Sequence, residues 1–164
     1  MPAVGIVLSR TEMSGGYFCS TVAFQRAGAW VQVRPLQKGG RNLRFSDFTV
    51  SAQEVVRLWR PGRVVTFDTM THSDARPTHP EDHITDLSTM KFRGVTTADA
   101  LAQITRQFTH QSLRDLFPNF VWQRNGKVYV KADHPQPRSL GHIPCQTVTI
   151  QQNEYALIGR RGGL

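Results

Sequence analysis

Short β-forming runs separated by glycine-containing turns constrain the fold of this chain more than any other feature. Apolar and β-branched residues fill three such runs, Ala3 to Leu8, Tyr17 to Phe24 and Ala29 to Val33. The second and third runs are separated by Gln25 to Gly28, and glycine supplies the positive φ that tight turns require. The pattern predicts a β-meander at the start of the chain.

The clearest hairpin signal lies in the second half of the chain. Two β-forming runs, Phe120 to Arg124 and Lys127 to Lys131, flank Asn125-Gly126, a preferred sequence for a two-residue type I′ turn. Three further short strands are expected, at 138–143, 146–150 and 155–158. The β pattern therefore extends over most of the chain.

One helix is expected between these β-rich parts. Apolar residues recur at three- and four-residue spacing from Leu101 to Phe108, and Thr96 or Thr97 is a suitable N-cap. The spacing predicts a helix near Thr97 to Phe117, in which Leu113, Leu116 and Phe117 either continue the helix or form a second one after a break near Thr109. The run Val50 to Leu58 is compatible with either a strand or a second short helix.

The chain is strongly basic. Its 164 residues include 20 Lys and Arg against 12 Asp and Glu, a formal net charge of +8. The sequence pI of about 10.3 exceeds the value of roughly 9 that is typical of nucleic-acid-binding domains. The same charge would also suit an acidic protein partner.

Cysteine content and hydropathy indicate the compartment. No run approaches the ~18 apolar residues that a membrane-spanning helix needs, and the N-terminus lacks the pattern of a signal peptide. Cys19 and Cys145 form neither a disulfide framework nor a C-x-x-C pair. We therefore expect a cytoplasmic protein with reduced thiols, without a membrane partner and without a cofactor.

Charge is distributed in blocks. Residues 26–63 contain eight bases and two acids, and residues 91–131 contain seven bases and two acids. Residues 68–86, between them, contain one base and five acids. This distribution predicts two modules joined by an acidic connector: residues 1–90 form the first, and residues 91–164 contain the helix and the second.

Short motifs distributed over most of the chain carry a family resemblance. They are Val7-Leu8-Ser9-Arg10 with Gly15-Gly16-Tyr17-Phe18-Cys19, Gly28-Ala29-Trp30-Val31-Gln32-Val33-Arg34-Pro35, Pro61-Gly62-Arg63-Val64-Val65, His79-Pro80-Glu81-Asp82 and Ser139-Leu140-Gly141-His142-Ile143. In this order they resemble the dual OB-containing domain of bacterial proteins, except that Gln32 and Val33 separate Val31 from Arg34-Pro35. The resemblance implies a mostly β fold with one or two short helices, built as two small OB-like β-barrel modules packed together. It also implies a nucleic-acid or nucleotide role, and no established reaction.

Arginines alternate with aromatic residues in the first third of the chain. Guanidinium groups bind phosphate bidentately, and aromatic rings stack on bases. We therefore expect a nucleic-acid-binding protein whose partner is single-stranded DNA or RNA. The expected contact residues are Arg34, Lys38, Arg41, Arg44, Phe45, Arg60, Arg63, Trp122, Arg124, Lys127, Tyr129 and Lys131. Of these, Lys38, Arg41 and Arg44 are the strongest candidates because they fall in a long, glycine-broken loop.

Two alternatives remain open. The densest group of possible metal ligands is His72, Asp74, His79, Glu81, Asp82 and His83. A few histidines and carboxylates with an open position can hold a hydrolytic metal, which would give a metal-dependent phosphodiesterase or nuclease. The spacing matches no strong zinc signature, and the same carboxylates suit a turn. The second alternative is a basic adaptor that binds an acidic protein.

Overall fold

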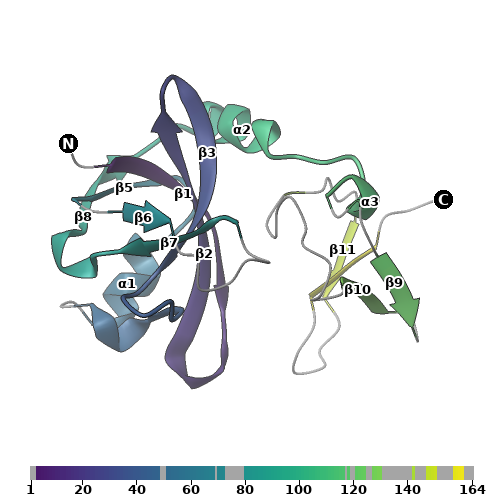
Figure 1. The fold of residues 1–164 in the computed structure, drawn as a ribbon, viewed down its shortest axis with the longest axis horizontal. Helices are drawn as coiled ribbons and strands as arrows, with labels where there is room; N and C mark the ends of the chain where they lie inside the picture. Colours follow the sequence, from purple (N-terminus) through teal and green to yellow (C-terminus); the bar gives the residue numbers. More distant parts are fainter. Residues whose placement is uncertain are drawn as a thin grey trace.

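The computed structural model describes residues 3–48, 51–68, 70–72, 80–116, 118, 121–124, 127–130, 142, 147–150 and 157–160 (Figure 1). The strands are β1 (Ala3–Glu12), β2 (Tyr17–Arg26), β3 (Ala29–Leu36), β4 (Leu43–Arg44), β5 (Arg63–Phe67), β6 (Met70–His72), β7 (Asp82–Thr85), β8 (Lys91–Val95), β9 (Val121–Arg124), β10 (Lys127–Val130), β11 (Thr147–Ile150) and β12 (Leu157–Arg160). The helices are α1 (Ala52–Leu58), α2 (Ala98–Gln107) and α3 (Leu113–Leu116), with short 3-10 turns η1 (Ser14–Gly16), η2 (Phe45–Asp47) and η3 (Leu87–Thr89). The predicted mostly β class is confirmed. No helix in the described residues has the length and apolar character needed to cross a membrane.

The predicted meander of β1, β2 and β3 is confirmed. The three strands pair antiparallel in sequence order, and a bulge between Val7 and Ser9 shifts the register of β1 on β2. Two residues connect β2 to β3, and both have positive φ, 49° at Ala27 and 82° at Gly28. Positive φ at both residues of a two-residue turn gives the turn a twist that matches the right-handed twist of the strands it joins.

The main sheet curls without closing. Its strand order is β6-β7-β3-β2-β1-β5-β8, and β4 adds to β2. Among the described strand pairs of this sheet, β7 on β3 alone is parallel. Because residues 68–69 alone separate β5 from β6, two strands far apart in the sheet order are adjacent along the chain, so the sheet must curve strongly.

The structure corrects the expectation of two β-barrels, because the main sheet is not closed. The described strand order begins at β6 and ends at β8, and no described residue pairs these end strands. After residue 118, the described strands form two separate two-stranded sheets, β9-β10 and β11-β12, rather than a second OB-like barrel. The predicted pairing of β9 with β10 is confirmed, whereas the turn Asn125-Gly126 lies outside the described residues.

Aromatic packing fills one face of the main sheet. Trp59, which follows α1, is fully buried and lies 5.7 Å from Phe18 between ring centroids. Its indole Nε1 donates a hydrogen bond to the Ser20 hydroxyl, so its one polar group is satisfied inside the core. The ambiguous run at 50–58 is helical: Ser51 caps α1 by accepting from the Glu54 backbone N–H.

Helix α2 covers part of the opposite face. Its buried Ile104 packs in a cluster with Ile6, Leu8 and Ala23 of β1 and β2. Thr97 is the N-cap and accepts from the backbone N–H of Ala100, which confirms one of the two predicted caps. The division of the chain into modules 1–90 and 91–164 stays a prediction. Two elements of the second range, β8 and α2, contact the main sheet.

Candidate nucleic-acid interface

A basic loop, residues 37–44, joins β3 to η2 and includes β4. An antiparallel bridge between Gln37 and Arg41 closes its first turn, where Gly39 and Gly40 have φ of 85° and 72°. At its end, β4 pairs with the start of β2, and Leu43 is fully buried. Backbone pairing therefore anchors the loop at both ends and fixes the positions from which its side chains extend.

Three bases of the basic loop point away from the core. Lys38, Arg41 and Arg44 are exposed, and none of them forms an ion pair within the part of the chain that the structure describes. The guanidinium of Arg44 lies over the ring of Tyr17, 5.3 Å from its centroid. Stacking on a ring holds the guanidinium plane while its N–H groups remain open to an anion.

The other predicted contacts from the first third differ in accessibility. Arg60 is exposed in the turn after α1, and Arg63 is half-buried at the start of β5. Phe45 stacks on the core residue Phe18, with ring centroids 5.0 Å apart. Because this contact joins Phe45 to the core, its ring is not a free platform for a base.

Arg34 corrects the predicted interface. Its side chain is 11% exposed, and its Nε donates to the Asp82 carboxylate, which has no exposure, at 2.5 Å. Burial alone would lower the pKa of Arg34, but the hydrogen bond and charge of Asp82 outweigh it and raise that pKa. Arg34 thus joins β3 to β7 and is not available to nucleic acid.

Cys19 lies beside this ion pair. Burial raises the pKa of the Cys19 thiol, and the nearby Arg34 opposes that rise without overcoming it. The thiol is a free cysteine of intermediate exposure. A neutral thiol in this position is a weak nucleophile, because the thiolate is the reactive form.

The hairpin residues are placed only by backbone register. Trp122 pairs with Tyr129, and Arg124 pairs with Lys127, across β9 and β10. Opposite residues share a face, and alternate residues along a strand do so too. The four positions therefore occupy one face of the ribbon, whereas Lys131 lies outside the described residues.

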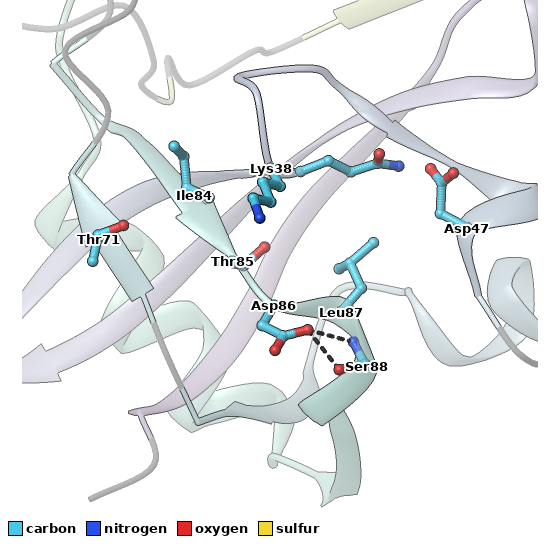
Figure 2. Close-up of a pocket in the computed structure, with 9 residues that line it drawn as sticks. Lys38, Asp47, Thr71, Ile84, Thr85, Asp86, Leu87 and Ser88 are labelled. Carbon is cyan, nitrogen blue, oxygen red and sulfur yellow. Dashed lines mark hydrogen bonds between the residues drawn. The ribbon is translucent and has the colours of Figure 1, made fainter.

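A hollow of about 760 Å³ opens beside the basic loop (Figure 2). It is lined by Gln37, Lys38, Asp47, Thr71, Ile84, Thr85, Asp86, Leu87 and Ser88. These residues come from three stretches that are far apart in sequence: the basic loop with η2, β6, and β7 with η3. Sequence reasoning missed this hollow, because the acids near Asp86 read as part of a connector and no local signal joins them to Lys38.

The possible metal ligands are only partly described. Asp82 is committed to Arg34, and His83 Nδ1 lies 3.0 Å from the Glu81 carbonyl oxygen. No group of three or more His, Cys, Asp or Glu positioned to hold a metal occurs among the described side chains. Asp74 and His79 lie outside the described residues, and the side chain of His72 is not described.

The fold and the site define a mostly β protein with a curled sheet and an anchored, exposed basic loop. In comparisons with known proteins, no family model, no curated protein and no solved structure matches the chain.

Proposed function

We propose that this protein binds single-stranded DNA or RNA through the basic loop. One observation carries the proposal: Lys38, Arg41 and Arg44 are exposed, form no ion pair with any described residue, and lie on a loop that the sheet anchors. The described arginines that do pair with acids are Arg10, Arg34 and Arg57. The three loop bases are therefore available to a phosphate backbone, and they share one anchored loop.

Electrostatics favours a polyanion over a small anion. The net charge of +8 attracts a nucleic acid from a distance. Close to the surface, each phosphate that a base neutralises releases a condensed counterion, which makes binding depend steeply on salt. Arg44 on Tyr17 adds a cation held in one orientation: its N–H groups can donate to a phosphate, and the guanidinium face turned away from Tyr17 can stack on a base.

We also propose that the main sheet is OB-like and that the chain is related to the dual OB-containing domain. An OB-fold is a five-stranded, partly open Greek-key barrel that binds oligonucleotides. If β5 and β6 count as one bent strand, the five strands are β1, β2, β3, β5–β6 and β7. In that count β5–β6 contacts β1 through β5 and β7 through β6, which supports a partly open barrel.

Fluorescence anisotropy over a salt series tests the proposed function. The probes are labelled single- and double-stranded DNA and RNA, with polyglutamate as an acidic polymer without bases. Single strands should bind more tightly than duplexes and polyglutamate, and the log of the affinity should fall by about 0.7 per phosphate contact for each tenfold rise in salt. No binding to any oligonucleotide at low salt would refute the proposal, and equal binding of polyglutamate would favour the adaptor alternative.

A further inference from the structure

The hollow beside the basic loop combines one cation, two carboxylates and apolar walls. Figure 2 shows the Lys38 side chain turned into it near Thr85 and Asp86, with Ile84 and Leu87 also lining it. Asp47 contributes the second carboxylate from η2. A volume of about 760 Å³ lies within the range of small-ligand pockets, which is roughly 300–1,000 Å³.

Part of each carboxylate remains available to a ligand. One oxygen of Asp86 accepts from the backbone N–H of Ser88 at 3.0 Å and from its hydroxyl at 2.7 Å. One oxygen of Asp47 accepts from the Arg44 backbone N–H at 2.7 Å. The second oxygen of each accepts nothing from a described residue, and neither carboxylate forms an ion pair with Lys38.

These groups disfavour a phosphate inside the hollow. Among its described lining residues, two carboxylates against one ammonium give a net negative charge, which repels an anion. An ionised carboxylate accepts hydrogen bonds and donates none, whereas an ammonium donates and accepts none. The matching ligand is therefore not an anion, has an apolar surface that can lie against Ile84 and Leu87, and carries both donors and acceptors.

We propose that this hollow binds a guanine base of the single strand whose phosphates contact the basic loop. The inference rests on the proposed function and adds its base preference. Guanine presents two neighbouring donors, N1–H and the N2 amino group, and two acceptors, O6 and N7. These donors are adjacent and point the same way, so they suit the Asp86 carboxylate, and O6 and N7 are the atoms that Lys contacts on guanine.

The other bases fit this set less well. Adenine and cytosine each present one exocyclic amino donor, and thymine or uracil presents a single ring N–H. Hypoxanthine, the base of inosine, retains N1–H, O6 and N7 but lacks the N2 amino group. Inosine therefore removes one contact from the ligand while leaving the protein unchanged.

The first experiment compares oligonucleotides on the unmodified protein. Labelled oligothymidines carry one central guanine, inosine, adenine or thymine, and affinity is measured by anisotropy at low salt. We expect guanine to bind about fivefold more tightly than inosine or adenine, the lower end for a base edge read by side chains. Equal affinities for all four would overturn this inference and leave the proposed function standing, whereas no binding at all would overturn both.

The second experiment changes the pocket while keeping its shape. Asp86→Asn preserves a side-chain oxygen to accept from Ser88, so η3 keeps its cap. It places an NH₂ donor where guanine also has donors, so the preference for guanine should disappear while affinity for oligothymidine stays within twofold. Asp68→Asn, an exposed acid that does not line the hollow, makes the same charge change and should retain the preference. Retention in Asp86→Asn, or equal loss in both variants, would overturn the inference.

Discussion

The buried ion pair between Arg34 and Asp82 gives the sharpest prediction about stability. It joins β3 to β7, strands that pair in parallel although the two residues are 48 positions apart. Asp82 has no exposure, so water cannot solvate its carboxylate when the partner is removed. Arg34→Met removes the guanidinium while keeping much of the side-chain volume.

The expected cost is large because a charge stays buried alone. Removing one partner of a buried pair costs about 3–5 kcal/mol, whereas replacing both partners with apolar residues is often neutral. The bond leaves Arg34 Nη2 and Asp82 Oδ2 without a hydrogen-bond partner among the described residues, so the intact pair is itself incompletely satisfied. The double variant Arg34→Met/Asp82→Leu should therefore recover most of the loss.

Denaturant unfolding followed by tryptophan fluorescence measures these effects, since Trp59 is fully buried. Arg34→Met should lower the free energy of unfolding by about 3–5 kcal/mol and the melting temperature by roughly 10 °C. Glu54→Gln is the control: it breaks the exposed pair with Arg57 and should cost less than about 0.5 kcal/mol. A cost below about 1 kcal/mol for Arg34→Met, or a double variant that costs the sum of its single changes, would refute the reasoning.

Three further predictions concern packing and titration. Gly5→Ala should lower the denaturation midpoint, costing about 1–3 kcal/mol, because its Cβ would lie 2.7 Å from the Phe24 ring; an unchanged midpoint would contradict this packing. Burial, with the charge of His110, lowers the pKa of His142 below its ordinary 6.5, so the fold favours the neutral ring. Unfolding free energy, measured by denaturation at each pH, should therefore fall as pH drops below about 6.5, and His142→Gln should flatten that fall; equal slopes would count against it. Because burial raises the Cys19 pKa, alkylation at pH 8, followed by mass spectrometry of the Cys19 peptide, should be severalfold slower in the native protein than in urea; equal rates would show an accessible thiolate.

Local signals in the sequence predicted the local elements. The turn expected within residues 25–28 and the cap expected at Thr96 or Thr97 depend on residues adjacent in the chain; the structure places the turn at Ala27 and Gly28 and the cap at Thr97. Whether 50–58 forms a strand or a helix depends on what its apolar residues pack against. Val55 and Trp59 are buried beneath the sheet, and that contact is not visible in a local pattern.

In the candidate site, too, local signals were predictive and contacts between distant residues were not. Lys38, Arg41 and Arg44 were predicted from a glycine-broken loop, and the structure places all three on the exposed surface. Arg34 has the same chemistry and lies nearby in sequence, but its burial depends on Asp82 and on a parallel pairing that no local pattern encodes. The hollow was missed for the same reason, since three stretches that are far apart in sequence line it.

Two charge-matched triple variants test the central claim most directly. One changes Lys38, Arg41 and Arg44 to Gln, and the other changes the exposed bases Arg26, Arg93 and Arg106 to Gln. Both lower the net charge equally, so long-range attraction falls by the same amount in each. Anisotropy with a labelled single-stranded oligonucleotide over a salt series should show a salt slope reduced by about 2 in the loop variant and little changed in the control. Equal losses in both variants would contradict binding through the basic loop.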